Sequence, residues 1–557
     1  MNAFRIATAT FVALAAAPLW ADATYTYTVA NDQATLTGFA EGVSPSGAIT
    51  VPASVDDYPV IGIDRGAFKG IATLSSITFA DGDSIESIGP QAFAECSGLK
   101  SVSLPSGLSA LSAGLFRDCS SLTSIDLPDG LTSVGPSAFA GCVSLTQIDF
   151  PEGLAEIGES AFLDCSSLTS ATLPETVTAI PAQAFAGCRN LSVLSLPSSI
   201  TTIADLAFSE CDSLASIELP ESLSELGANA FRGCDSLSSV EINAQLATIG
   251  EEAFADCPEL ETLEVISGNA SFSSVDGALF DASQATLILV PPGKSGTYTV
   301  PSSVTSLASG AFDHCSQLVS IDLPTTVSVL PDGTFYYATK LASIELPDTL
   351  SSIGEWAFSG CNSLTGIRLP DGVVEIDDDA FHYAASLLWA QFEGDSPTVG
   401  ETVFDNAAEG FTVYFYSYND GFTVPTWLDY ASVALDKATP YLGWLIVQGL
   451  DLSADMNADL NGDGVTLILA YALGLDPNLN LRDALPQPSL TSDGAVSLTY
   501  YAGSHGIDYT IESSEDLQNW SDAGVSLSEL DADQTVTATA STETGAAFLR
   551  LSISVSQ

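Results

Sequence analysis

The chain has 557 residues, of which 70 are acidic and only 13 are basic, so its formal net charge is −57 at pH 7. A surface this negative repels phosphate groups, which excludes nucleic acid and anionic membranes as favoured partners. Hydrophobic residues make up 46% of the sequence, a fraction that predicts a folded chain. Solubility in a salty or cation-rich medium is the simplest explanation of the acidity.

The first residues have the pattern of an export signal. Asn2 and Arg5 precede an apolar run from Ile6 to about Trp20, and the small residues of Ala21–Ala23 suit a cleavage site. The apolar run is about fifteen residues long, which is short of the roughly 20 that span a bilayer. We therefore expect residues 1–23 to be a signal peptide whose cleavage leaves no transmembrane segment.

A repeat of 23 residues organises most of the chain. Phenylalanine recurs at this spacing from Phe93 to Phe254 and again from Phe312 to Phe404. One repeat, Leu122–Leu145, reads LTSIDLPDGLTSVGPSAFAGCVSL. Its I-D-L segment alternates like a strand with one buried face, the proline that follows ends that strand, and A-F-x-x-C has the spacing of a helical or 3₁₀ turn. A fixed period of this length predicts a solenoid.

The repeat resembles that of the BspA-type leucine-rich repeat proteins, which runs L-x-x-I-x-L-P-x-x-L-x-x-I-x-x-x-A-F-x-x-C. The opening segment YTVANDQATLTGF and the interrupting segment NASFSSVDGALF also resemble the family. The resemblance covers residues 24–434, with an N-terminal cap at 24–65, an irregular interruption at 262–300 and a C-terminal cap at 390–434. It implies a β-rich array of short parallel strands and 3₁₀ or short helical turns. Members are typically secreted or surface-exposed and are associated with adhesion and protein binding.

Each of the ten cysteines lies three residues after a phenylalanine of the repeat. Ile71, Ala338 and Ala384 occupy the same position in repeats that lack the cysteine. A position that accepts isoleucine or alanine is buried and apolar, so we expect free thiols packed in a column. A disulfide framework is the alternative for an exported chain with an even cysteine count. Zinc is disfavoured, because neither histidine nor a C-x-x-C pair accompanies the cysteines.

Carboxylates occupy the position between the isoleucine and leucine of the strand in seven of eleven repeats. This position is expected to face solvent on the inner curve of the solenoid. Like charges at the strand spacing are unfavourable unless cations or basic groups lie between them. The sequence thus predicts a face for divalent cations or a basic partner, with a merely solvated polar face as the alternative. We call these residues the acidic strand column: Asp126, Asp149, Glu218, Glu241, Glu264, Asp322 and Glu345.

Aromatic residues concentrate between Trp389 and Tyr430, at the expected end of the array. A terminal repeat must cover the last open part of the core, so most of these rings are predicted to pack in the C-terminal cap. A binding patch that includes Tyr416 and Tyr418 is the alternative.

Residues 435–487 are predicted to form a helical link, with short helices at Tyr441–Gly449 and Thr466–Leu475. Between them, DLSADMNADLNGDGV has the D-x-N-x-D-G spacing of an EF-hand or dockerin-like calcium loop. Position 12 of this loop is Ala470, where calcium loops have a bidentate acid, and we find no second loop of the dockerin kind. An acidic helix-capping turn is therefore the alternative to a weak calcium site. The candidate ligands are Asp455, Asn457, Asp459, Asn461 and Asp463.

The segments VSLTYY, YTIESS and TVTATA alternate within residues 488–557 and predict a small antiparallel β domain. This region is similar to carboxyl-terminal modules of secreted proteins from environmental Gram-negative bacteria, which suggests a role in sorting or attachment.

Catalytic motifs are missing from the sequence. Neither H-E-x-x-H nor G-x-S-x-G occurs, and Ile288 replaces the first glycine that a P-loop ending at Gly293–Ser295 would need. The three histidines, His314, His382 and His505, are predicted to be structural or exposed. We therefore expect no enzyme.

Two functions agree with these patterns. The first is an exported, non-enzymatic binding or adhesion scaffold whose solenoid surface meets a protein or another cell-surface macromolecule. The alternative is a cation-stabilised extracellular spacer, or a passenger whose C-terminal module mediates sorting or attachment.

Overall fold

The computed structural model describes residues 25–80, 84–436, 441–450, 454–482, 484–491, 495–504, 507–514, 517–522, 525–530, 534–540 and 548–555. The expected signal peptide, residues 1–23, lies outside these ranges. The chain forms two compact units. Unit 1 extends to Leu364 and also includes Gly372–Ser386 and Pro397–Ala407, whereas unit 2 comprises Thr365–Asp371, Leu387–Ser396 and the residues from Ala408 onward.

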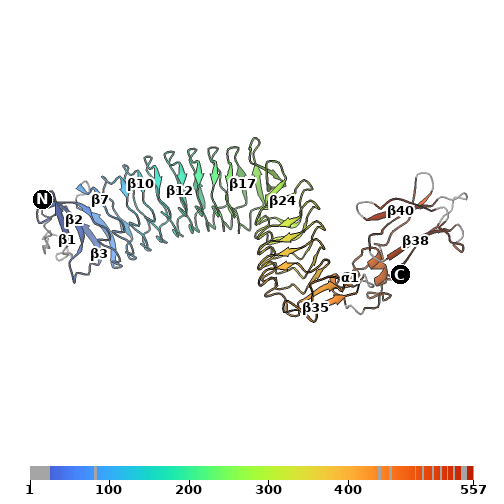
Figure 1. The fold of residues 1–557 in the computed structure, drawn as a ribbon. Helices are drawn as coiled ribbons and strands as arrows, with labels where there is room; N and C mark the ends of the chain where they lie inside the picture. The colour runs from blue at the N-terminus through green and yellow to red at the C-terminus, as the bar shows by residue number, and fades with distance from the viewer. Residues whose placement is uncertain are drawn as a thin grey trace. The chain divides into compact units, whose positions relative to one another are not determined.

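Unit 1 is a solenoid of short parallel strands (Figure 1), as the 23-residue period predicts. A regular coil contributes two short segments to two rows of parallel strands. Its I-x-L segment belongs to the first row, and a two-residue strand belongs to the second row. In the first row, Ser239 pairs with Thr262, and in the second row Ser133 pairs with Glu156. The register therefore advances by one whole repeat at each step, which places equivalent residues of successive repeats side by side.

The first row of unit 1 contains β3 (Gly47–Val51), β6 (Leu74–Phe79), β8 (Ser101–Val102), β12 (Ser170–Thr172), β14 (Val193–Ser195), β17 (Ser239–Ile242), β19 (Thr262–Val265), β23 (Ser295–Thr299), β25 (Gln317–Asp322) and β27 (Ser343–Glu345). The second row contains β5 (Tyr58–Ile63), β7 (Ser87–Ile88), β9 (Ala110–Leu111), β10 (Ser133–Val134), β11 (Glu156–Ile157), β13 (Ala179–Ile180), β15 (Thr202–Ile203), β16 (Glu225–Leu226), β18 (Thr248–Ile249), β22 (Thr286–Leu289), β24 (Ser306–Leu307), β26 (Val329–Leu330), β28 (Ser352–Ile353), β30 (Glu375–Ile376) and β32 (Thr398–Val399). At the N-terminal end, β1 (Tyr25–Ala30) pairs antiparallel with β2 (Gln33–Phe39), and β4 (Ser54–Val55) pairs with β5.

The third side of each coil is the turn edge, the segment that runs from about four residues before the phenylalanine to the cysteine position. Along this edge the backbone N–H groups alternate between two kinds of partner. Phe139 N–H donates to the carbonyl of Ala161 in the next coil at 2.8 Å, whereas Ala138 and Ala140 donate to carbonyls three residues earlier. The expected helical or 3₁₀ turn is therefore a series of hydrogen-bonded turns whose alternate amides join neighbouring coils.

The phenylalanines form the centre of the core. From Phe68 to Phe254, successive rings are stacked with centroids 5.2–5.7 Å apart, and all of them are buried. The stack resumes from Phe312 to Phe404. Between the two stacks, Val290 N–H donates to the carbonyl of Ala311, the bond that a phenylalanine makes in other coils. Valine thus takes the phenylalanine position where the repeat is interrupted.

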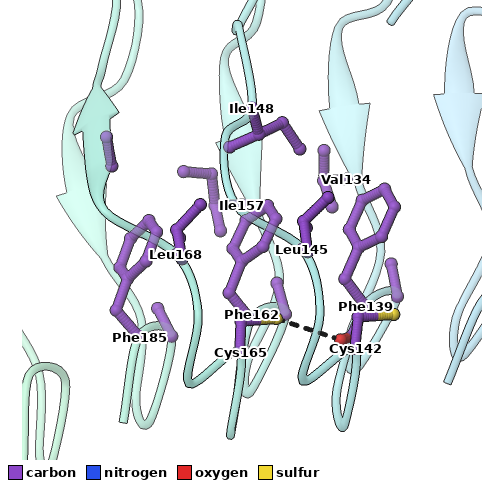
Figure 2. Packing of buried hydrophobic residues seen from close by; sticks show 14 of the residues in the cluster. Val134, Phe139, Cys142, Leu145, Ile148, Ile157, Phe162, Cys165, Leu168 and Phe185 are labelled. Atoms are coloured by element: carbon purple, nitrogen blue, oxygen red, sulfur yellow. Dashed lines mark hydrogen bonds between the residues drawn. The ribbon is translucent and has the colours of Figure 1, made fainter. Parts of the chain in front are cut away.

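All ten cysteines are free and buried, which confirms the prediction of a thiol column. In most coils the thiol donates to the carbonyl of the phenylalanine 26 residues earlier, as Cys165 does to Phe139 at 3.2 Å (Figure 2). Burial raises the pKa of Cys96 to about 11 and that of Cys142 to about 12. The thiols act as small apolar groups that also satisfy a buried carbonyl.

The interruption inserts two antiparallel pairings into the parallel array. β20 (Phe272–Val275) pairs with β21 (Ala278–Asp281), and β21 pairs with β22, which rejoins the second row through β24. Asn269 closes the preceding turn, because its amide donates to two carbonyls and its oxygen accepts two backbone N–H groups.

Unit 2 combines the last strands of the first row with the C-terminal segments. β29 (Gly366–Leu369), β31 (Trp389–Phe392), β33 (Thr412–Tyr416) and β35 (Tyr430–Leu435) pair in parallel, and β34 (Thr426–Trp427) pairs antiparallel with β35. The two predicted helices are present as α1 (Leu442–Val447) and α2 (Leu467–Ala472). The remaining strands form antiparallel pairs: β36 (Ser489–Leu490), β37 (Val496–Tyr501), β38 (Ile507–Ser514), β39 (Val525–Leu527), β40 (Thr535–Ala540) and β41 (Phe548–Val555).

Replacement of Phe208 by alanine tests the ring column. Phe208 is stacked between Phe185 at 5.6 Å and Phe231 at 5.4 Å, so its removal leaves a cavity that neighbouring coils cannot fill. We expect Phe208→Ala to lower the free energy of unfolding in urea by about 3 to 5 kcal/mol. The control Val193→Ala, at a side chain that is 58% exposed, should change it by less than about 0.5 kcal/mol. Equal effects of the two substitutions would contradict this packing.

Thiol titration tests the cysteine column. Because the thiolate is the reactive form and burial disfavours it, we expect almost no reaction with a thiol reagent in the native protein. After denaturation without a reductant, all ten cysteines should react. A count near zero under those conditions would indicate disulfides and overturn the assignment.

Candidate functional site

The acidic strand column is the first candidate site, and the structure places all seven of its carboxylate residues on the exposed side of their coils. The flanking isoleucines and leucines point inward: Ile125, for example, is buried while Asp126 is exposed. The alternation predicted from the I-x-L pattern therefore holds at these positions. Asp126, Asp149, Glu218, Glu241, Glu264, Asp322 and Glu345 all belong to unit 1.

Like charges face one another where the strands of this column pair. Glu241 lies opposite Glu264 in the pairing of β17 with β19, and Asp322 lies opposite Glu345 in the pairing of β25 with β27. Directly opposed like charges destabilise a sheet. Within the ranges that the structure describes, no lysine or arginine forms an ion pair with any member of the column. The column therefore offers negative charge to an external cation or basic group.

The arginines of the regular coils pair elsewhere. Arg189 contacts Glu210 and Asp212, and Arg232 contacts Glu252 at 3.0 Å. These acidic partners lie on or beside the turn edge. The two arginines therefore do not neutralise the carboxylates of the acidic strand column.

In unit 2 the equivalent positions lose their acidic character. Arg368 in β29 forms two hydrogen bonds with Glu393, at 2.5 and 2.7 Å, and pairs in register with Gln391 of β31. Gln391 is 2% exposed, its amide donates to the Tyr416 hydroxyl at 3.4 Å, and its Oε1 has no hydrogen-bond partner. The acidic strand column is thus a feature of unit 1 alone.

The aromatic residues near the end of the array pack mainly with one another, as expected of a cap. Phe392, Phe422 and Trp427 lie with ring centroids 5.0–5.3 Å apart. Tyr416 and Tyr418 stack at 5.5 Å, and Tyr418 is 52% exposed. The structure therefore brings together the two tyrosines of the alternative binding patch, with one of them open to solvent.

In the acidic loop of the link, the predicted ligands bond to the backbone. The Asp459 carboxylate accepts N–H bonds from Gly462, Asp463 and Gly464 at 2.8–3.2 Å. Asp455 accepts the N–H of Asn457 at 3.0 Å. These bonds close the loop on itself and do not reach α2, whose N-cap Thr466 makes no side-chain cap hydrogen bond. The loop is therefore not the helix-capping turn of the alternative. No three His, Cys, Asp or Glu side chains in the described ranges are grouped to hold a metal ion. Calcium binding by this loop stays a prediction.

A second segment, Asp476–Leu481, lies against this loop. Asn461 donates to the carbonyls of Pro477 and Leu479, and Asp463 accepts the N–H of Leu481 at 2.7 Å. The hydrogen bond from Leu481 N–H is the largest cause of the lowered pKa of the Asp463 carboxyl. This neighbouring segment was not predicted from the sequence. Its D-P-N-L-N pattern places oxygen-bearing side chains at alternate positions, as the acidic loop does, and could have indicated the pairing.

Two of the three histidines lie on the turn edge, and His505 lies outside the described residues. His314 is hydrogen-bonded to Asp313 at 2.7 Å and His382 is paired with Asp379 at 3.1 Å. Burial lowers the pKa of His314, but the hydrogen bond and charge of Asp313 outweigh it and leave the pKa above its ordinary value. Both imidazoles therefore have structural partners.

Three exposed aromatic residues on the turn edge were missed by sequence reasoning. Tyr337, Trp356 and Tyr383 are between 40% and 55% exposed. Alignment of the residues two before and two after each phenylalanine reveals them, because most other coils have small or polar residues there.

The described helices are all too short to cross a bilayer with an apolar stretch. This finding concerns only the described part of the chain.

The comparisons with known proteins agree with this architecture. The BspA-type leucine-rich repeat region matches residues 61–192, 155–286 and 294–409. A leucine-rich repeat protein from Bacteroides ovatus is 25% identical, with a TM-score of 0.50 over 75% of this chain and 100% of that one. A leucine-rich cell surface protein from Faecalibacterium prausnitzii is 27% identical, with a TM-score of 0.49 over 73% and 96%. No curated protein sequence matches the chain. Since the repeat region matches more than half of its residues, the chain belongs to the BspA-type leucine-rich repeat family.

Proposed function

We propose that this protein is an exported, non-enzymatic scaffold that binds a protein or another cell-surface macromolecule through its solenoid. The acidic strand column carries the proposal. Seven carboxylates are exposed in unit 1 without ion pairs to lysine or arginine among the described residues, and two pairs of them face each other directly. A basic partner removes this repulsion on binding and is steered toward the column by its charge.

Family and sequence give further support. Arrays of the BspA type are typically scaffolds at the cell surface or outside the cell. The export pattern of residues 1–23 agrees with such a location, and the missing catalytic motifs agree with binding without turnover.

The alternative is a spacer stabilised by cations, in which the column and the acidic loop hold divalent ions and the C-terminal module attaches the protein. The facing glutamates of β17 and β19 also favour this function, because a bound cation would relieve the same repulsion. Unit 2 joins strands of the array to the C-terminal segments, so deletion of the C-terminal region would cut a compact unit. Tests of either function therefore use the full chain.

Neutralisation of the column separates the two functions. The full chain is immobilised, and binding of the basic protein lysozyme is compared with that of the acidic protein α-lactalbumin. We expect lysozyme to bind and α-lactalbumin not to bind. Exchange of all seven column residues for asparagine or glutamine should weaken lysozyme binding by at least about tenfold, since each exposed charge pair contributes about 0.2 to 1 kcal/mol.

A control variant neutralises seven exposed acids outside the column: Asp129, Glu152, Glu156, Glu175, Glu221, Glu225 and Asp348. The change in charge is the same, so the binding should fall much less. If both variants lose equal affinity, binding depends on net charge and the column is not a site.

Calcium dependence tests the spacer. At a calcium concentration a hundredfold above Kd, a site that exists only in the folded state adds about 2.7 kcal/mol of stability. We expect calcium to raise the melting temperature more than sodium does at matched ionic strength. In the double variant Asp459→Ala, Asp463→Ala, the part of this increment that belongs to the link should disappear.

The control Asp129→Ala, Glu152→Ala removes the same charge and should retain the full increment. Equal melting temperatures in calcium and sodium would mean that the loop and the column are only solvated acids.

A further inference from the structure

Five ring-bearing side chains gather on the turn edge of the coils that contain Phe335, Phe358 and Phe381. All belong to unit 1. Tyr337, Trp356 and Tyr383 are 40%, 45% and 55% exposed. We call the group the turn-edge patch: Tyr336, Tyr337, Trp356, His382 and Tyr383.

Contacts hold the rings in place. The Tyr337 ring lies over Gly360 of the next coil, where a Cβ would meet its carbons at 3.2 Å. Trp356 Nε1 donates to Asp379 Oδ2 at 3.2 Å. Tyr383 stacks on the His382 ring at 4.1 Å. The other face of the Tyr337 ring is stacked on His314 at 5.4 Å, so the ordered rings that the patch presents to a ligand are those of Trp356 and Tyr383.

Folding does not explain these rings. Tyr337, Trp356 and Tyr383 have φ values of 53°, 56° and 57°, in the left-handed region that bulky residues avoid. The conformation itself is common to the coils, because equivalent positions adopt it with residues such as Ser137, Leu206 and Glu210; the aromatic side chains are what distinguishes these three positions. In the coils from Phe93 to Phe254, the positions that correspond to the patch contain no aromatic residue. Half-exposed aromatic residues that the coil does not require are characteristic of interaction surfaces.

Carboxylates line one side of the patch. The position three residues before the phenylalanine is acidic in four successive coils, and we call this set the edge acid column: Asp332, Glu355, Asp378 and Glu401. Asp332 accepts the N–H of Glu355 at 3.0 Å, and Asp378 accepts that of Glu401 at 2.6 Å. Desolvation and the charges of Asp332 and Asp378 raise the pKa of the Glu355 carboxyl, as expected for crowded acids.

Positive charge is missing from this surface. Residues 331–338, 354–360, 377–383 and 400–406 contain neither lysine nor arginine. The ion pairs found in the described ranges do not include the edge acid column. In contrast, the turn edge of the earlier coils contains Arg117 and Arg232.

We propose that the turn-edge patch and the edge acid column together bind an extended, arginine- or lysine-bearing peptide segment of a partner protein. The faces of tryptophan and tyrosine attract guanidinium and ammonium groups, and carboxylates accept their N–H bonds. Four coils at about 4.8 Å span on the order of 15 Å, about the length of five extended residues. A neutral glycan would use the rings without the acids, so the charge of the surface favours the cationic peptide.

This inference goes beyond the proposed function, because the turn edge is a different side of the coil from the acidic strand column. The two can therefore fail separately.

The test measures fluorescence anisotropy of a labelled Gly-Arg-Gly-Arg-Gly amide with the full chain in about 150 mM NaCl, where long-range attraction is screened. A peptide with citrulline in place of arginine is the neutral probe. The ring variant combines Tyr337→Asn, Trp356→Ser and Tyr383→Asn, which keeps the charge and uses residue types found at these positions in other coils, such as Asn406 and Ser137.

The edge-acid variant combines Asp332→Asn, Glu355→Gln, Asp378→Asn and Glu401→Gln. Its matched control makes the same change of charge at exposed acids that lie outside both the edge acid column and the acidic strand column: Asp129→Asn, Asp348→Asn, Glu152→Gln and Glu221→Gln. Circular dichroism and melting temperature establish that each variant is folded.

We expect the ring variant and the edge-acid variant each to raise Kd by about tenfold or more, and the control by less than about threefold. The citrulline peptide should not bind. The proposal is overturned if the wild type does not bind the arginine peptide, if the ring variant binds like the wild type, or if the control loses as much affinity as the edge-acid variant. It is also overturned if neutral chitopentaose displaces the peptide and the ring variant loses chitopentaose binding, which would identify a glycan surface.

Discussion

No coil of this protein can bury its own apolar face, and the rest of the structure depends on that constraint. The contacts that complete the interior join neighbouring coils. Phenylalanine rings stack from coil to coil, and cysteine thiols donate to the phenylalanine carbonyl of the preceding coil. Alternate amides of the turn edge donate to carbonyls of the following coil. Stability in such an array is approximately a sum of nearest-neighbour terms. Where the repeat is interrupted, Val290 preserves this connection by taking the place of a phenylalanine.

The same constraint separates folding from recognition. Because the inward positions secure the fold, the outward positions can vary from coil to coil. Unit 1 uses this freedom in two ways. On the strand side it places Glu241 opposite Glu264 and Asp322 opposite Glu345, against the preference of a sheet. On the turn edge it places Tyr337, Trp356 and Tyr383 in a backbone conformation that suits glycine. The opposed carboxylates cost folding stability and the exposed rings are not needed by the coil, which is why we interpret both surfaces as binding surfaces.

Sequence reasoning predicted most of the fold, because equivalent positions of a repeat share one environment. The buried phenylalanines, free thiols and exposed acids follow from the period, and α1, α2 and the C-terminal strands follow from local patterns. The hydrogen-bond pattern of the turn edge could not be predicted from the sequence. The i+3 spacing of apolar residues is the same in a 3₁₀ turn and in turns whose alternate N–H groups donate to the next coil. Tyr337 and Trp356 also escaped notice, because they flank the phenylalanine at different positions and become neighbours only when the coils stack. The contact between Asp463 and Leu481 depends on a fold-back that spacing does not reveal.

The most direct test of the account is removal of one whole coil. Deletion of residues 186–208 joins Phe185 to Ser209 and keeps every interior column in register, because it removes 23 residues. Deletion of residues 186–207 removes one residue fewer and puts the columns out of register. We expect the first variant to retain a cooperative thermal transition and native circular dichroism per residue, whereas the second should melt at a much lower temperature or fail to fold. If the two deletions behave alike, stacking of equivalent positions is not what specifies this structure.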